Sequence, residues 1–381
     1  MTLLQMLRQL IACNSISSPN PDIDQGNREL IDTLADWLDT LGFDTEVMVL
    51  EDSRKANLIA TLGSGPGGLV LAGHTDTVPC DEGLWQQSPF ELTERDNRLY
   101  GLGICDMKSF FALAIEAAKP LLGKTPKQPL IILATADEES SMSGAKALVE
   151  AGKPKARYAL IGEPTGLKPI ATHKGIVVER LVIQGKSGHS SNPALGANAL
   201  LTMHDALGVL RALQAEFREQ YRDPLFEVDY PTLNLGHIHG GDNPNRICGR
   251  CELDFEVRPL PGMNIEELHQ LLEQRLLILG ANEGTKPTLE YVVGVPPFAC
   301  PRQSELLRYC EQLTGHSAGA VAFATEAPYL QELGMEVLVM GPGDIDQAHQ
   351  PNEYLAADRI QPMTHYLTEL INTYCYSDNS P

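Results

Sequence analysis

Short, almost wholly apolar runs constrain the fold of this chain more than any other feature of its sequence. They are LVLAGH (69–74), LIILATA (130–136) and YALIGE (158–163), and segments with helical spacing lie between them. A strand that is apolar on both faces is typical of a parallel sheet covered by helices on both sides. The first part of the chain therefore predicts an α/β domain with a mainly parallel sheet.

The spacing of apolar residues also places the neighbouring elements of this first part. Helices are expected near the start of the chain and over 27–41, 108–122 and 143–151, and strands over 44–50 and 56–62. The same style returns late in the chain, where we expect a helix over 302–314, a strand over 336–340 and a helix over 358–374.

The middle of the chain has a different rhythm. Residues 176–184 alternate between apolar and polar, as in an antiparallel strand with one wet face. The following pattern predicts a helix at 195–214, strands at 231–239 and 247–258, a helix at 264–279 and a strand at 286–293. The order β-α-β-β-α-β is typical of a ferredoxin-like unit. We therefore expect residues 1–175 and 291–381 to form one domain, with an α+β domain of residues 176–290 inserted into it.

Length and charge exclude several classes of protein. At about 150 residues per domain, 381 residues suit two or three units. With 29 Lys and Arg against 50 Asp and Glu, the net charge of −21 repels phosphate backbones and anionic lipids, so neither a nucleic-acid nor a membrane partner is expected. No apolar run is long enough to span a membrane, and eight cysteines are too sparse for a disulfide framework. These features predict a cytoplasmic protein.

Polar side chains follow each of the apolar runs. His74 and Asp76 end the first, Glu138 and Glu139 follow the second, and Glu163 ends the third. Ligands of parallel α/β sheets bind at the carboxyl ends of the strands, and carboxylates that converge there need a cation. Asp106, in a Gly-rich turn before a helix, can join them. Nitrogen and oxygen donors without thiolate suit Zn, Mn or Co, with Zn the usual choice.

Each of these residues alone has a more ordinary interpretation. A lone His74 is more often a satisfied histidine, and a Glu138-Glu139 pair is more often a solvated helix start. His74 and Asp76 lie two apart, however, so Asp76 can share a face with the imidazole and orient it. Adjacent carboxylates diverge, so one can bind metal while the other transfers a proton. Their joint occurrence at successive strand ends favours a site.

Several segments resemble the dinuclear-zinc aminoacylase and carboxypeptidase family over essentially the whole chain. They are HTDTVP (74–79), GICDMKS (103–109), ATADEESSMSGA (134–145), IGEPT (161–165) and QAHQPNEY (347–354). The resemblance is closest to family members that deacetylate N-acetylornithine, through EPTGLKPIATHKG (163–175), GKSGHSSNPALGANA (185–199) and a long stretch at 323–355. Ser109 departs from the glycine expected there, and a serine is tolerated unless the backbone needs positive φ.

The resemblance implies a ligand set for two divalent metal ions, with Zn expected and Co as an alternative. Asp106 would bridge them, with His74 and Glu163 on one ion and Glu139 and His349 on the other. His349 comes from the resemblance alone. Asp76 would support His74, and Glu138 would act as general base and acid.

Further roles implied by the resemblance concern the inserted domain and the substrate. That domain would act as a lid and carry a homodimer contact, and His189 would reach an active site, usually the partner subunit's, to stabilise an oxyanion. The residues expected to bind substrate are Asn245, Arg258, Thr325 and Glu326. A turn residue, a surface-strand arginine and an exposed or capping Glu326 are the competing interpretations of these positions.

The expected activity is hydrolysis of a small N-acetylated amino acid, N2-acetyl-L-ornithine, to L-ornithine and acetate, a step of arginine biosynthesis. The alternative within the family is another N-acyl amino-acid hydrolase, such as a succinyl-diaminopimelate desuccinylase or a broad aminoacylase. A succinyl group would need an extra cation, and no added basic cluster lies near the motifs. The alternative outside the class of enzymes, a binding protein that has lost turnover, conflicts with the presence of Glu138 and every expected ligand.

Overall fold

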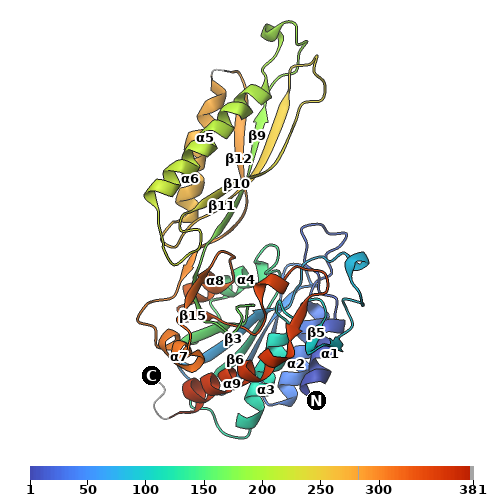
Figure 1. Ribbon diagram of the computed structural model, residues 1–381, viewed down its shortest axis with the longest axis vertical. Helices are drawn as coiled ribbons and strands as arrows, with labels where there is room; N and C mark the ends of the chain where they lie inside the picture. Colours follow the sequence, from blue (N-terminus) through green and yellow to red (C-terminus); the bar gives the residue numbers. More distant parts are fainter. Residues whose placement is uncertain (282, 378–381) are drawn as a thin grey trace. The chain divides into compact units, whose positions relative to one another are not determined.

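The computed structural model describes residues 1–281 and 283–377, which fall into two compact units (Figure 1). Unit 1 contains residues 1–171, 300–319 and those from 325 onward, and unit 2 contains 172–299 and 320–324. The expected insert, 176–290, lies within the span of unit 2, which extends beyond it at both ends.

Strand β13 and parts of β8 and β14 consist of unit 2 residues, and the other strands of a mixed sheet belong to unit 1. This sheet has the order β1-β2-β6-β3-β7-β15-β8-β13, and β14 pairs with β8. Its strands are β1 (Asp44–Val49), β2 (Ala56–Leu62), β3 (Leu69–His74), β6 (Leu130–Thr135), β7 (Tyr158–Ile161), β8 (Ile170–His173), β13 (Phe298–Ala299), β14 (Gly319–Val321) and β15 (Glu336–Val339). The central strands β6, β3, β7 and β15 are parallel, and antiparallel pairs continue the sheet at both ends. The predicted parallel sheet is thus confirmed at its centre, where the apolar runs lie.

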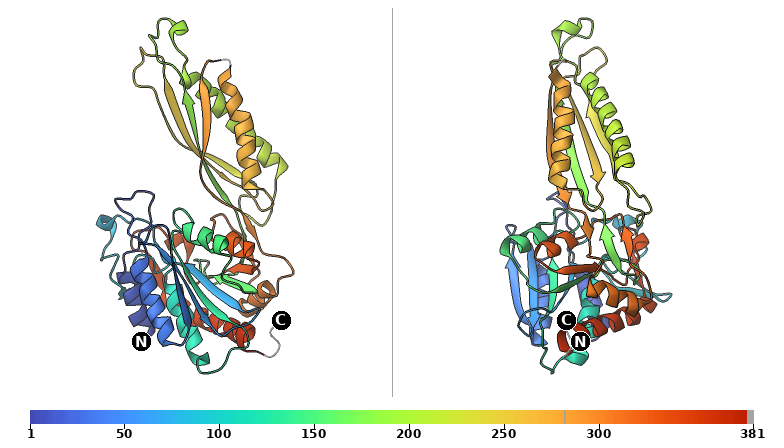
Figure 2. Two further views of the ribbon diagram at one scale, coloured as in Figure 1. Left: turned by 180° about the vertical axis from the view of Figure 1, so that it is seen from behind. Right: turned by 90° about the vertical axis from the view of Figure 1, so that its left-hand side faces the viewer.

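Helices cover both faces of this sheet (Figures 1 and 2). They are α1 (Leu3–Ala12), α2 (Arg28–Thr40), α3 (Ser109–Ala118), α4 (Ser143–Ala151), α7 (Glu305–Thr314), α8 (Ala327–Glu332) and α9 (Ile360–Ile371). α1 and α9 both pack on α3, and α4 packs on α8. A small antiparallel sheet of β4 (Thr93–Arg95), β5 (Arg98–Tyr100) and β16 (Tyr354–Ala356) joins two distant segments of the chain. This sheet brings the loop before α3 next to the loop that follows β15.

Unit 2 has the order that the sequence predicts. Its elements are β9 (Ile176–Gln184), α5 (Ala199–Gln220), β10 (Thr232–Gly240), β11 (Arg250–Arg258), α6 (Ile265–Leu276) and β12 (Lys286–Val295). The sheet is antiparallel with the order β10-β11-β9-β12, which is the ferredoxin-like arrangement. Alternate residues of β9 and β11, among them Leu181 and Phe255, are buried against Leu210 of α5 and Leu272 of α6. On β11 the alternate residues Glu252, Asp254 and Glu256 are only half-buried, whereas Glu179 of β9 is fully buried and contacts His269.

Two helices begin later in the chain than predicted, because a capping side chain fixes the first residue of each. The helix expected at 195–214 begins at Ala199, because the Asn198 side chain accepts a hydrogen bond from the Leu200 N–H and caps it. α7 likewise begins after Ser304, whose hydroxyl accepts from the Leu307 N–H. The short helix α8 and the small sheet of β4, β5 and β16 were not expected from the periodicity.

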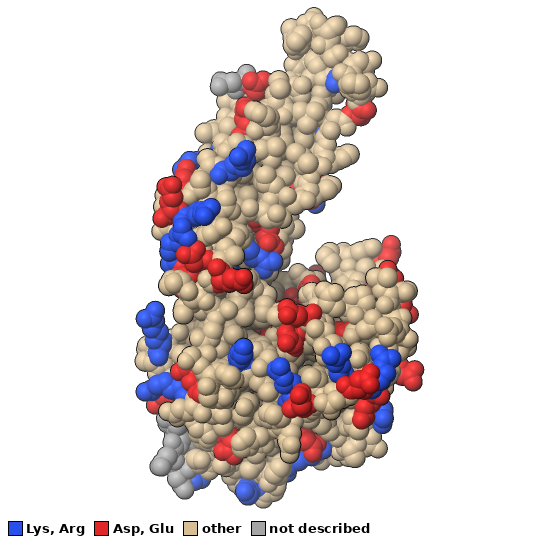
Figure 3. All heavy atoms as spheres, in the orientation of Figure 1, with Lys and Arg blue, Asp and Glu red and all other residues tan. Residues whose placement is uncertain are grey.

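Charged side chains are mixed over the surface. On the face shown in Figure 3, Asp and Glu side chains lie among Lys and Arg side chains in both units. Within the described residues, no helix combines the length and the hydropathy that a membrane span requires.

Candidate metal centre

The centre is built on the last residue of β3. The His74 side chain is only 1% exposed, and its Nδ1 donates a hydrogen bond to the Asp76 backbone carbonyl at 2.9 Å. That bond places the ring proton on Nδ1, so Nε2 of the neutral ring presents a lone pair. Nε2 nevertheless lies 3.2 Å from Asp106 Oδ1 and 3.8 Å from Glu163 Oε1, which are both acceptors. A proton or a metal ion has to lie between these groups.

Asp106 lies in the loop between β5 and α3, where Gly103 has the positive φ of 78° that a glycine tolerates. One carboxylate oxygen faces His74, and the other lies 3.5 Å from His349 Nε2. Burial alone would raise the pKa of Asp106, but hydrogen bonds with His349 and His74 hold it well below its usual range. Asp106 therefore stands between the two imidazoles as an ionised group.

Glu138 and Glu139 follow β6 on a turn in which Asp137 has a φ of 60°. Their backbone N–H groups donate to the Asp76 carboxylate at 3.2 and 3.0 Å. The Glu139 side chain accepts a hydrogen bond from His349 Nε2 at 3.0 Å. The Asp76 side chain thus holds the turn that carries both glutamates, while its backbone carbonyl orients His74.

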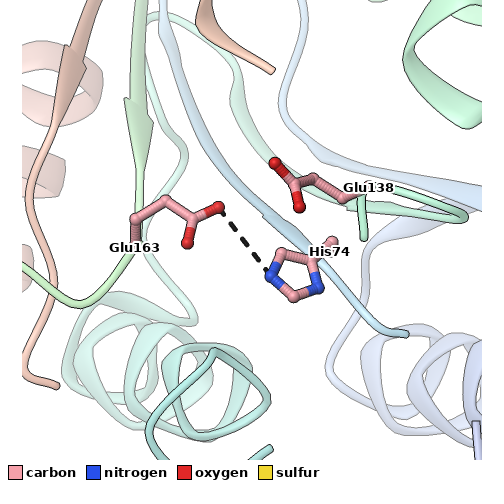
Figure 4. Close-up of side chains that lie close together, drawn as sticks. All are labelled: His74, Glu138 and Glu163. Atoms are coloured by element: carbon pink, nitrogen blue, oxygen red, sulfur yellow. Dashed lines mark ion pairs between the residues drawn. The ribbon is translucent and has the colours of Figure 1, made fainter. Parts of the chain in front are cut away.

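Glu163 follows β7, and its carboxylate points toward the His74 ring, which the Glu138 carboxylate also approaches (Figure 4). Gly341, after β15, lets the chain approach closely here, because an added Cβ would lie 2.0 Å from the Gly162 carbonyl oxygen. Burial raises the pKa of Glu163 well above its ordinary value. Its buried Oε1 has no hydrogen-bond partner among the described residues. An unsatisfied carboxylate oxygen that faces an imidazole nitrogen is an environment suited to a bound cation.

The donor atoms are close enough together to hold metal ions. Those of His74, Glu138 and Glu163 all lie within 4.8 Å of one another, and so do those of His74, Asp106 and Glu139. Burial opposes a charged His74, but the carboxylates of Glu163, Asp106 and Asp76 raise its pKa well above the ordinary value. The excess of carboxylates over imidazoles, and the absence of thiolate from the cluster, fit hard or borderline divalent ions.

His349 reaches the cluster from the loop after β15, with a backbone φ of 58°. Its side chain is half exposed, and its hydrogen bonds with Asp106 and Glu139 raise its pKa to about 10. Every residue expected as a metal ligand therefore lies in one cluster of unit 1, although the segments that supply them are far apart in the chain.

Thr325 and Glu326, at the start of α8, are buried near this cluster rather than exposed. The Thr325 hydroxyl accepts a hydrogen bond from the Ala327 N–H. Glu326 stands at the N-cap position of α8, but its side chain accepts no hydrogen bond from the N–H groups of the helix. Instead, Glu326 Oε2 accepts a hydrogen bond of 2.8 Å from Thr135 at the end of β6. Its other oxygen is buried without a hydrogen-bond partner in the described chain, and burial raises its pKa to about 7.

The other expected site residues belong to unit 2. His189 is exposed, and its Nδ1 is 2.8 Å from the Ser191 hydroxyl. Asn245 is exposed in the loop after β10, where its backbone carbonyl accepts from the Ser190 N–H. Arg258 forms a two-point ion pair with Glu256 on its own strand, at 2.7 and 3.0 Å. None of these contacts reaches the residues of the cluster.

The sequence pattern did not predict the role of Lys55, which binds the turn of residues 137–139 that follows β6. Lys55 is buried between two carboxylates, and its Nζ donates to Asp137 at 2.7 Å and to Asp24 at 3.0 Å. Asp137 also accepts from the hydroxyls of Ser17 and Ser143. A lysine within a short polar stretch carries no local signal of burial, so only the fold reveals this contact.

Comparison with known proteins places the chain in a family. The model of "Peptidase family M20/M25/M40" matches residues 70–373. The acetylornithine deacetylase of Edwardsiella ictaluri is 48% identical over 374 residues, which cover 98% of this chain and 97% of that protein. The acetylornithine deacetylase of Pasteurella multocida is also 48% identical over 374 residues, covering 98% of both proteins.

Solved structures share the fold at lower identity. The aminopeptidase PepT of Bacillus cereus matches with a TM-score of 0.77 and 19% identity over 97% of both chains. A Bacillus subtilis protein described as a dinuclear metal binding peptidase matches with a TM-score of 0.69 and 15% identity, over 97% of this chain and 96% of that one. These structures show the shared fold, and the family model and the two deacetylases lead to one assignment: the chain belongs to the M20/M25/M40 peptidase family and is a hydrolytic enzyme.

Proposed function

We propose that this chain removes the acetyl group from N2-acetyl-L-ornithine, giving L-ornithine and acetate, with two divalent metal ions. The observation that carries the proposal is the cluster around His74, where a buried carboxylate oxygen of Glu163 faces an imidazole nitrogen and lacks a hydrogen-bond partner in the described chain. The names of the relatives that are 48% identical over nearly the whole chain support this substrate. A place in arginine biosynthesis is part of the proposal.

We assign the ligands by their positions in the cluster. His74 and Glu163 would hold one ion, and Glu139 and His349 the other. Asp106, which directs one oxygen to each imidazole, would bridge them. We expect Zn in both positions, with Co as an alternative. The Bacillus subtilis peptidase with this fold is described as binding two metals, which supports the number of ions.

Two bound ions supply Lewis acidity, which makes a water molecule more acidic and polarises an amide carbonyl. Glu138 is the group that moves protons. Its carboxylate takes a proton from the attacking water as the C–O bond forms, and delivers it to the amide nitrogen as the C–N bond breaks. The backbone N–H of Glu138 is held by Asp76, which fixes where this proton acceptor stands. We assign His189 the role of donating a hydrogen bond to the developing oxyanion.

The surroundings of the cluster favour a small, uncharged acyl group. A cavity of about 230 Å³ opens beside His349 and is lined mainly by apolar groups. The ionisable side chains in its lining are those of Cys80, Asp81 and His349. Its lining residues are Val78, Pro79, Cys80, Asp81, Leu84, Trp85, Leu102, His349, Gln350 and Pro351. Because no lysine or arginine lines this cavity, it offers no partner for the second carboxylate of a succinyl group.

The rest of the substrate needs groups of both charges. We assign the substrate α-carboxylate to Arg258 and Asn245, with Arg258 exchanging its Glu256 partner for the substrate. We assign the side-chain ammonium to Glu326, whose second oxygen is buried without a hydrogen-bond partner in the described chain, with Thr325 beside it. A buried carboxylate without a partner attracts a cation more strongly than an exposed one does.

We further propose that the chain acts as a homodimer, with residues 176–290 as lid and dimerisation domain and residues 1–175 and 291–381 as catalytic domain. β10 is an edge strand of the unit 2 sheet. Its Leu235 and Ile238 are exposed, as are Leu200 and Leu201 at the start of α5. A long edge strand with exposed apolar residues is suited to pairing with a second copy.

The free state of the cysteines supports the cytoplasm as the proposed location. All eight cysteines are free thiols, and seven of them are buried. Thiols persist in this state in a reducing compartment.

The proposal is tested by turnover of three substrates with the metal-loaded and the chelated protein. We expect hydrolysis of N-acetylornithine to exceed that of N-acetylmethionine and succinyl-diaminopimelate. Chelation should abolish all activity, and Zn or Co should restore it. Full activity of the metal-free protein, or a preference for the succinyl substrate, would contradict the proposal.

Glu138→Gln is nearly isosteric but cannot take up a proton. We expect kcat to fall by at least about 100-fold while the metal content stays at two ions per chain, as measured by elemental analysis. Glu139→Gln is the matched control, since loss of a ligand should lower the metal content together with the rate. Loss of metal from Glu138→Gln in proportion to its rate would instead make Glu138 a ligand.

Glu326→Gln tests the ammonium contact. A charge-paired contact contributes about 1.5–3 kcal/mol, so kcat/KM for N-acetylornithine should fall roughly 10- to 100-fold. The value for N-acetylmethionine, whose side chain is uncharged, should change much less. Glu332→Gln, an exposed substitution on the same helix, serves as the control. Equal losses on both substrates would remove Glu326 from substrate selection.

Mixing two inactive variants tests whether His189 acts across the dimer. A hybrid of His189→Ala with Glu138→Gln has one site with both intact groups if His189 serves the partner's site, and none if it serves its own. We expect activity to return when the variants are unfolded and refolded together, with dimers verified by sedimentation. Hybrids that form without regaining activity would exclude a role across the dimer.

A further inference from the structure

A buried carboxylate outside the ligand set joins the loops that carry Asp106 and His349. Glu353 is 2% exposed and lies four residues after His349, immediately before β16. Its Oε2 accepts a hydrogen bond from the Gly103 N–H at 2.9 Å. Its Oε1 accepts from the N–H groups of Cys105 and Asp106 at 2.7 and 3.1 Å. One side chain therefore binds three backbone N–H groups of the Asp106 loop.

Backbone contacts join the same two loops on either side of this carboxylate. The Gly101 N–H donates to the Glu353 carbonyl at 3.2 Å, and Tyr354 pairs with Tyr100 where β16 meets β5. On the other side, Cys105 Sγ donates to the Asp344 carbonyl at 3.3 Å. The Glu353 side chain lies between these contacts, so it fixes the part of the Asp106 loop that ends at the ligand itself.

The chemistry of this contact requires a carboxylate. Both oxygens accept hydrogen bonds, and all three donors are backbone N–H groups whose positions are set by the loop. An amide in its place would present an NH₂ group to at least one of these donors. A buried N–H group would then lose its acceptor, and the loop could relieve this only by moving.

We propose that Glu353 is a positioning residue that couples the Asp106 loop to the His349 loop and thereby sets metal affinity. The inference rests on the ligand assignment of the proposed function. The ion held by Asp106, Glu139 and His349 draws two of its ligands from the coupled loops. The ion held by His74, Asp106 and Glu163 draws one. Loss of the coupling therefore lowers the affinity for the first ion more than the affinity for the second.

The test measures metal binding to Glu353→Gln without any substrate. Metal-free protein is titrated with Co²⁺ and followed by calorimetry and by the visible absorption of the bound ion. Wild type is expected to take up two equivalents. Glu353→Gln should bind one of them at least roughly 10-fold more weakly, the effect typical of groups that orient metal ligands. Its one-ion spectrum should match that of His349→Ala and not that of His74→Ala.

Two further variants separate positioning from general loss of structure. Asp346→Asn, an exposed substitution on the His349 loop, should bind both ions as wild type does. Glu353→Asp keeps the charge but is too short to reach all three N–H groups, so its affinity should fall between wild type and Glu353→Gln. If Glu353→Gln does not fold, the metal affinity of Glu353→Asp tests the proposal in its place.

The proposal is overturned if folded Glu353→Gln, or Glu353→Asp in its place, binds both equivalents with wild-type affinity and spectrum. A lower melting temperature of the metal-free variant with unchanged affinities would show a structural role alone and would overturn it as well. Because no substrate is used, failure of wild type to hydrolyse N-acetylornithine leaves this result unaffected.

Discussion

Repulsion between carboxylates around a single buried imidazole is the constraint on which the centre of this structure depends. Asp76, Asp106 and Glu163 all lie close to His74, and Glu138 and Glu139 face the same space. Burial makes that repulsion strong, because charges removed from water interact through a low dielectric. Divalent cations relieve it, which is why the same arrangement that would destabilise a bare protein is suited to binding metal.

The fold holds these groups in place through contacts with residues that are not themselves proposed metal ligands. The Asp76 carboxylate binds the backbone of the Glu138-Glu139 turn, and Lys55 neutralises Asp137 and Asp24 beneath that turn. Parallel pairing of β3 with β6 sets His74 opposite Thr135, so the strand ends reach the same level. The geometry of the proposed ligands is thus determined by backbone donors and strand register, and such preorganisation reduces the conformational entropy lost on binding.

The sequence predicted what depends on local pattern and on the family resemblance. The apolar runs at 69–74, 130–136 and 158–163 became the buried strands β3, β6 and β7, because burial on both faces leaves a continuous apolar signal. Short elements such as α8 and β16 were missed, since a few residues carry too little periodicity. Lys55 and Glu353 were also missed. Their partners, Asp137 and Asp106, lie 82 and 247 residues away in the chain, so their roles appear only when the fold brings them together.

A shared metal cluster does not by itself select a substrate. The solved structures with this fold include a carnosine dipeptidase, a tripeptidase and an aminobenzoyl-glutamate utilization protein, so the names found on one fold span different substrates. Discrimination must then come from groups outside the ligand set. In unit 1 the groups that we propose for this are the cavity beside His349, which has no lysine or arginine in its lining, and the buried carboxylate of Glu326. On our proposal, the first would disfavour an anionic acyl group and the second would favour a cationic side chain, and N-acetylornithine combines an uncharged acetyl group with an ammonium.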